Sequence, residues 1–151
     1  MTRMMFVNLP VTDLAASRRF LEAIGATNEP KFTDDTAACM RFSDSIFVMI
    51  LTHAKYRDFT DLPIGDPRTA SQASICLSCD SRAAVDEVVA RGAAAGGGAD
   101  PSPVQDYGFM YGRGVTDPDG FVFDFMWMDP VAAEAGPAAM ALADGSVPLP
   151  A

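Results

Sequence analysis

Residues 115–129, V-T-D-P-D-G-F-V-F-D-F-M-W-M-D, combine a turn signature with a dense aromatic segment. The D-P-D-G of residues 117–120 has turn chemistry, because proline presets φ, aspartate caps bends and glycine accepts a positive φ. The nine residues that follow are rich in aromatic and β-branched types and predict a strand buried on both faces. An ionised Asp124 in such a strand is costly unless it is paired, hydrogen-bonded or bound to a metal. Counting in twos places the following residues on one face of the strand: Val122, Asp124, Met126 and Met128.

The composition indicates one domain of ordinary size. The chain has 151 residues, of which 49% are hydrophobic, enough for a real core. Its net charge of −9 argues against nucleic acid and anionic membrane as partners. We expect no signal peptide and no membrane span. Three cysteines, an odd and sparse set, favour a reducing cytoplasm over a disulfide framework.

The first part of the chain predicts one strand, one helix and further strands. Residues 4–11 alternate as a strand with Asn8 in its middle, and Pro10 confines that strand to a sheet edge, or is itself confined to the strand's last residues. Asp13 caps a helix that ends at Gly25. Three further strands are expected near residues 31–32, 36–42 and 46–52. Residues 53–72 are polar, contain two prolines, and read as a connector.

The second part repeats this order. Residues 74–79 predict a strand, Asp80 and Ser81 a cap, and the following helical pattern stops at Gly92. Residues 108–115 and then the Asp124 strand complete the unit. Residues 130–151 are rich in alanine and proline and predict a short helix at best, or disorder.

The two parts match in length as well as in order. Asn8 and Ser74, and likewise Asp13 and Asp80, are separated by nearly the same number of residues. Such repetition indicates two copies of a βαβββ unit. We therefore predict an α+β fold with modules at residues 4–52 and 73–129, their strands forming a cup-shaped mixed sheet with the helices outside.

This order, together with the D-P-D-G turn before the last strand, resembles the vicinal oxygen chelate superfamily, and most closely its glyoxalase/bleomycin-resistance branch. The superfamily also includes extradiol dioxygenases. Its metal-dependent members carry histidine and glutamate ligands on the first and last strands of each module. The resemblance places those positions at Asn8, Ile50, Ser74 and Asp124, so it implies that these four side chains converge in the cup. One carboxylate without an imidazole holds a divalent ion weakly, so we expect no metal cofactor.

Three functions remain open at this point. The first is binding of a small organic molecule, such as an antibiotic or a metabolite, by a metal-free homodimer of the kind usual among similar proteins. The second is a glyoxalase-type lyase or isomerase in which Asp124 is catalytic and a metal is weakly held. The third is a scaffold whose cup is filled by side chains. The expected ligand-binding residues are Asn8, Ile50, Ser74, Tyr107, Met110 and Asp124.

Other possible motifs have simpler explanations. Cys76-Leu77-Ser78-Cys79 spells C-x-x-C, but residues three apart in a strand point to opposite faces, so core packing is favoured over a redox or zinc site. Cys76 shares a face with Ser74 and is a further candidate for the cup. His53, the only histidine, cannot supply a histidine-based metal site and is expected in the connector. Asn8, Ser74 and Asp124 would either orient a ligand or hydrogen-bond among themselves.

Overall fold

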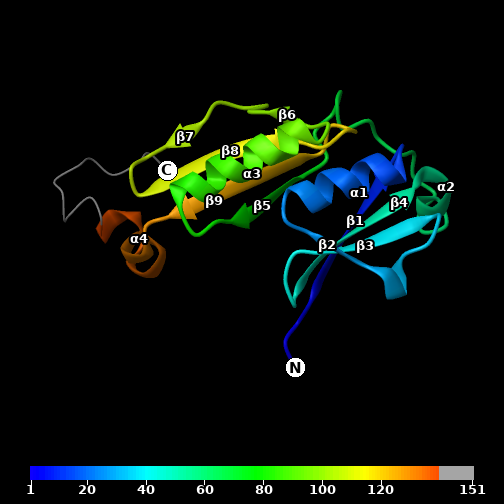
Figure 1. Ribbon diagram of the computed structural model, residues 1–151, viewed down its shortest axis with the longest axis horizontal. Helices are drawn as coiled ribbons and strands as arrows, with labels where there is room; N and C mark the ends of the chain where they lie inside the picture. Colours follow the sequence, from blue (N-terminus) through cyan, green and yellow to red (C-terminus); the bar gives the residue numbers. More distant parts are fainter. Residues whose placement is uncertain (140–151) are drawn as a thin grey trace.

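The computed structural model describes residues 1–139 and contains two modules that lie side by side, each with its own sheet and its own long helix (Figure 1). In chain order, the first module consists of β1 (Met5–Val11), α1 (Leu14–Ala23), β2 (Thr27–Glu29), the 3-10 helix η1 (Pro30–Phe32), β3 (Ala37–Arg41) and β4 (Ile46–Thr52). The second consists of β5 (Ser74–Ser78), α3 (Arg82–Ala94), β6 (Gly98–Ala99), β7 (Gln105–Asp106), β8 (Met110–Thr116) and β9 (Val122–Met128). Short helices α2 (His53–Tyr56) and α4 (Pro130–Ala135) follow β4 and β9. The predicted α+β class with two βαβββ modules is confirmed.

The first and last strands of each module pair in parallel. The strand order is β1-β4-β3-β2 in the first sheet and β5-β9-β8-β6 in the second, where β7 also pairs with β8. β1 runs parallel to β4 and β5 runs parallel to β9. Pro10 lies in β1, at the edge of the first sheet, as predicted for a residue that has no N–H to donate. Within residues 1–139 no strand of one sheet pairs with a strand of the other, so the expected single cup is divided into two open sheet faces.

Each sheet buries one face beneath one helix. Asp13 and Ser81 cap these helices as predicted, since each side chain accepts a hydrogen bond of 3.0 Å from a backbone N–H in the first turn. In β9, Phe123 and Phe125 are buried on the helix side, whereas Asp124 is partly exposed on the other. The prediction that this strand is buried on both faces is therefore wrong, because α3 covers only one of them.

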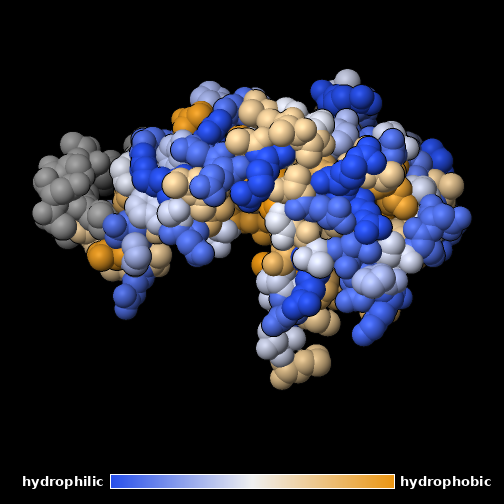
Figure 2. Space-filling model, in the orientation of Figure 1, coloured by the Kyte–Doolittle hydropathy of each residue, from blue (hydrophilic) through white to orange (hydrophobic). Residues whose placement is uncertain are grey.

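The two helices bring the modules together over a shared core. The rings of Phe20 from α1 and Phe123 from β9 have centroids 5.7 Å apart. α3 does not stop at Gly92 as predicted but continues to Ala94. Gly92 faces the core, where an added Cβ would lie 2.9 Å from the Ile24 side chain, so glycine at this position lets α1 and α3 approach closely. A cleft of about 610 Å³ remains between the modules, and Figure 2 shows the molecule hollowed there, with hydrophobic residues visible in the hollow.

Two further predictions about local structure need correction. Residues 31–32 form part of the 3-10 helix η1 rather than a strand. Pro30 starts this turn and the Glu29 carboxylate accepts a hydrogen bond from the Lys31 N–H at 3.2 Å, an arrangement that ends β2. The connector contains one helical turn, α2, capped by Thr52. Of the predicted tail, α4 is a short helix, and residues 140–151 lie outside the described residues.

No helix within residues 1–139 is long and apolar enough to cross a membrane.

The D-P-D-G turn joins the second module to the first. The Asp119 carboxylate accepts hydrogen bonds from the Thr12 backbone N–H at 3.2 Å and the Thr12 hydroxyl at 2.6 Å. The Asp117 carboxylate accepts N–H bonds from Asp119 at 2.9 Å and Phe121 at 2.8 Å. Burial is the main cause that raises the pKa of Asp117 to about 6. Gly120 has φ +102°, the conformation for which the sequence signature selects glycine.

The raised pKa of Asp117 gives stability a specific pH dependence. The pKa of Asp117 is higher in the folded protein than in the unfolded chain. The stabilisation that the protonated Asp117 carboxyl group gives to the folded state is therefore fully present below about pH 4 and is lost as the pH rises through 6. We expect Asp117→Asn, which keeps the Oδ1 acceptor, to flatten the stability curve between pH 4 and 7 relative to the wild-type protein. Urea unfolding at several pH values measures the difference. Parallel curves for the two proteins would contradict this role of Asp117.

Candidate functional site

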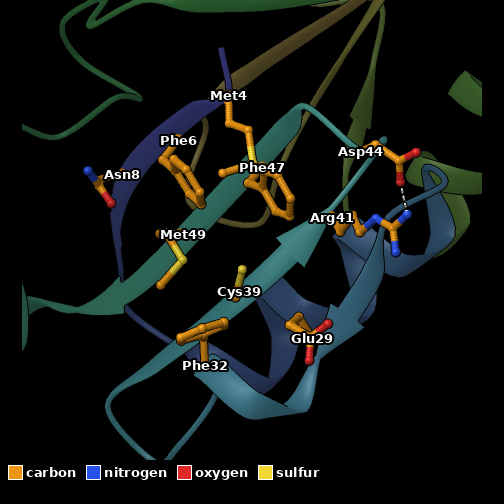
Figure 3. A pocket seen from close by; sticks show the side chains of 10 residues that line it. All are labelled: Met4, Phe6, Asn8, Glu29, Phe32, Cys39, Arg41, Asp44, Phe47 and Met49. Atoms are coloured by element: carbon orange, nitrogen blue, oxygen red, sulfur yellow. Dashed lines mark hydrogen bonds and ion pairs between the residues drawn. The ribbon is translucent and has the colours of Figure 1, made fainter. Parts of the chain in front are cut away.

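The open face of the first sheet carries an apolar cavity. It has a volume of about 720 Å³ and lies on the first sheet, on the face away from α1 (Figure 3). We call it the first cavity. Its lining residues come from β1 and the residue before it, from β2 and η1, and from β3, β4 and the turn between them: Met4, Phe6, Asn8, Glu29, Phe32, Cys39, Arg41, Asp44, Phe47 and Met49.

Aromatic side chains form the walls of the first cavity. Phe6 and Phe47 occupy paired positions on β1 and β4, and their rings are stacked with centroids 4.8 Å apart. Phe32 from η1 stands on the other side of the cavity and is 68% exposed. Cys39 and Met49, paired across β3 and β4, lie between these walls. Large apolar groups exposed together in this way mark a surface that binds something.

Charged groups gather at one end of the first cavity. Arg41 forms an ion pair with Asp44, and Glu29 lies nearby on β2 (Figure 3). Burial, and secondly the negative charge of Glu29, raise the pKa of the Cys39 thiol, so this thiol stays neutral. The first cavity is thus an apolar space with a charged rim.

The second open face carries a smaller and more polar cavity, centred on Asp124. It has a volume of about 250 Å³, and we call it the second cavity. Its floor is formed by β5, β8 and β9, where Cys76, Asp124 and Gly114 stand side by side in register. Its lining residues are Cys76, Ser102, Pro103, Gln105, Met110, Gly112, Arg113, Gly114, Asp124, Phe125 and Met126.

The room around Asp124 depends on glycine. A Cβ added to Gly114 would lie 2.7 Å from Asp124 Oδ1, so any other residue would displace the carboxylate. On the opposite side, burial and secondly the charge of Asp124 raise the pKa of the Cys76 thiol. The thiol therefore stays neutral and adds no second negative charge beside Asp124.

Solved structures share this architecture. No family model matches the chain, and no curated protein is significantly similar to it. A glyoxalase/bleomycin resistance protein/dioxygenase family enzyme from Burkholderia phytofirmans PsJN is 19% identical over 84% of this chain and 99% of its own, with a TM-score of 0.68. A glyoxalase-related enzyme from Fulvimarina pelagi is 18% identical over 87% and 91%, with a TM-score of 0.71. The fosfomycin resistance protein FosX from Listeria monocytogenes is 18% identical over 84% and 91%, with a TM-score of 0.61.

The chain has the glyoxalase/bleomycin-resistance fold. This is the architecture of the vicinal oxygen chelate superfamily, as the sequence predicted. A shared fold at this level of identity does not carry a shared activity, because one fold hosts many chemistries.

The donor set of this glyoxalase-fold chain does not fit the metal of the metal-dependent members. Asn8 supplies a neutral amide to the first cavity, and Asp124 supplies one carboxylate to the second. Ser74 is an exposed hydroxyl at the edge strand β5, and Ile50 has no donor. Among residues 1–139 no three histidine, cysteine, aspartate or glutamate side chains gather as a metal site would require. We derive no reaction step through a metal.

Within one chain, the structure does not bring together the four positions that the resemblance assigns to metal ligands. Asn8 lies in the first cavity, whereas Asp124 lies in the second with Cys76 and Met110. The prediction that Ile50 binds a ligand is wrong, because its side chain is 1% exposed and belongs to the core. The pleat alternates, so Met49, its neighbour on β4, faces the cavity instead.

The other predicted ligand-binding residues are also separated. Ser74 shares the open face of Cys76 but is not among the residues that line the second cavity. Tyr107 is exposed beyond β7, where its ring stacks on Phe109 with centroids 6.3 Å apart, and it lines neither cavity. His53 lies in α2, at the connector as expected, close to Thr12 and Asp119.

Sequence reasoning missed most of the first cavity. Phe6 and Phe47 share faces with Asn8 and Met49 by simple alternation, a signal that was present in the sequence. Phe32 and Glu29 could not be found in this way, because the prediction placed residues 31–32 in a strand.

Proposed function

We propose that this protein binds a small organic molecule with an apolar, partly aromatic body, without a resident metal. One observation carries the proposal: the first cavity, of about 720 Å³, is lined by stacked and exposed phenylalanines. Its size falls within the range of small-molecule sites, which combine apolar walls with a few polar groups. A fosfomycin resistance protein has the same fold.

Phe32 tests this proposal together with a matched control. Phe32 is 68% exposed in the first cavity and Phe59 is 70% exposed on the connector. We expect Phe32→Ala to weaken binding of the neutral fluorescent dye Nile red by about tenfold, because a large part of the buried ring contact is lost. Phe59→Ala should leave binding unchanged. Fluorescence titration measures both. Equal losses in the two variants, or no dye binding to the wild-type protein, would overturn the proposal.

The protein is proposed to act as a homodimer that brings a first cavity and a second cavity together. Within one chain the two cavities share no lining residue. β1 is an edge strand that exposes Met4, Met5 and Phe6, and exposed apolar edges are normally covered by pairing or packing. A second copy of the chain would cover this edge.

The three cysteines are free thiols, which supports operation in a reducing compartment such as the cytoplasm.

Sedimentation equilibrium tests the dimer. We expect twice the chain mass of 16.0 kDa at micromolar concentration. Met5→Glu, at a side chain that is 62% exposed, should shift the equilibrium to monomers because it places a charge in the apolar contact. Phe59→Glu, on the connector, should remain dimeric. A monomeric wild-type protein, or a fully dimeric Met5→Glu variant, would count against the second copy.

The lyase or isomerase alternative depends on Asp124. Its carboxylate opens into the second cavity, where a general base could take a proton from a bound substrate. In an enzyme of that kind Asp124→Asn would abolish turnover, while Nile red would still bind in the first cavity. Steady-state kinetics and dye titration on the same variant separate the two functions. Undiminished turnover in Asp124→Asn would remove this alternative.

A further inference from the structure

Among residues 1–139 no cation balances the charge of the Asp124 carboxylate. The arginines of the second sheet, Arg82 and Arg113, are paired with other carboxylates. Arg113 contacts Asp100 at 2.7 Å and Asp86 at 2.8 Å, and Arg82 pairs with Asp106. The Tyr111 hydroxyl, and secondly Arg113, lower the pKa of Asp86. Hydrogen bonds from Arg113 and Arg82 lower the pKa values of Asp100 and Asp106, and the bonds to Asp100 and Asp86 raise that of Arg113. Among the described residues, the Asp124 carboxylate takes part in no ion pair or hydrogen bond.

Glycine residues form the floor of the second cavity beside Asp124. Gly112 and Gly114 occupy the floor positions on β8, so backbone rather than side chains faces the cavity there. The Pro101 ring carbons are 3.5 Å from the place of a Gly114 Cβ, so Pro101 packs on Gly114, and Pro103 lines the cavity. A Cβ added to Gly112 would have no neighbour closer than 3.7 Å, so the floor is open there and has room for a planar group.

The segment 101–105 adds hydrogen-bond acceptors to the second cavity. The Ser102 hydroxyl and the Gln105 amide line the same cavity as Asp124. The segment that carries them is held at both ends by ion pairs. Asp100, before it, pairs with Arg113, and Asp106, after it, pairs with Arg82, whose guanidinium lies 4.5 Å from the centroid of the Tyr111 ring. The acceptors are therefore positioned before any ligand arrives.

We infer that the second cavity is a recognition site for a planar cation of the amidinium or guanidinium type, with Asp124 as its counter-charge. Two parallel N–H donors of such a group match the two oxygens of a carboxylate. The remaining N–H donors would reach Gln105 and Ser102, and the flat group would lie on the glycine floor. The inference rests on the proposed binding function and names the class of polar group that its ligand carries. The net charge of −9 would favour the approach of a cation.

Benzamidine is the probe that tests this inference, with benzamide as a neutral control of nearly the same shape. In ¹⁵N-resolved NMR titrations at pH 7, we expect benzamidine to shift the amide signals of Gly112 and Gly114 and the side-chain amide of Gln105, with a Kd of about 1 mM or tighter. Benzamide should bind at least tenfold more weakly, because it lacks the charge. Equal binding of the two compounds, or benzamidine shifts confined to other residues, would overturn the inference.

Three substitutions complete the experiment. Asp124→Asn should weaken benzamidine binding at least tenfold, whereas Asp61→Asn, on the exposed connector, should leave it unchanged. Gln105→Leu, in an exposed segment where folding is not at risk, should weaken it several-fold and serves if Asp124→Asn does not fold. Nile red binding in the first cavity is measured in parallel. Dye binding without benzamidine binding defeats this inference alone, and benzamidine binding without dye binding defeats the apolar site alone.

Discussion

Each sheet of this protein has one long helix, and one helix covers one face. This constraint determines where a ligand can bind. Phe123 and Phe125 are buried beneath α3, and the alternation of the strand then places Asp124 on the uncovered side. In the same way, Val48 and Ile50 are buried beneath α1, while Phe47 and Met49 line the first cavity. Both cavities lie on the faces opposite the helices, which no helix covers within residues 1–139.

The two open faces differ although both belong to a βαβββ module. On the first, phenylalanines and methionines line a large apolar cavity with charges only at its rim. On the second, glycines on β8 clear space around a single carboxylate, and the segment 101–105 borders it with polar groups. Of the four positions that the resemblance assigns to metal ligands, only Asp124 is a carboxylate and none is a histidine.

The relative placement of the modules depends on contacts that lie away from either cavity. Phe20 packs against Phe123, Gly92 allows the helices to approach, and Asp119 accepts two hydrogen bonds from Thr12. The first two contacts join the helix-covered sides of the two sheets, and the third joins the D-P-D-G turn to the first module. They leave the cavity sides free, so residues there can change without loss of the fold.

The sequence by itself determined the architecture. The repeated order of strand, cap and helix, and the D-P-D-G turn, predicted two βαβββ modules, because local turn chemistry and periodicity act over short distances. Alternation alone also placed Asp124 and Met126 on one face of their strand and Cys76 on the face of Ser74, but the sequence did not show that the Asp124 face is open. Only the tertiary structure decided that Asn8 and Asp124 lie in separate cavities and that Ile50 belongs to the core. It also showed that Phe32 turns into the first cavity from a 3-10 helix. These facts depend on sheet register and on which face each helix covers, and such long-range packing leaves no period in the sequence.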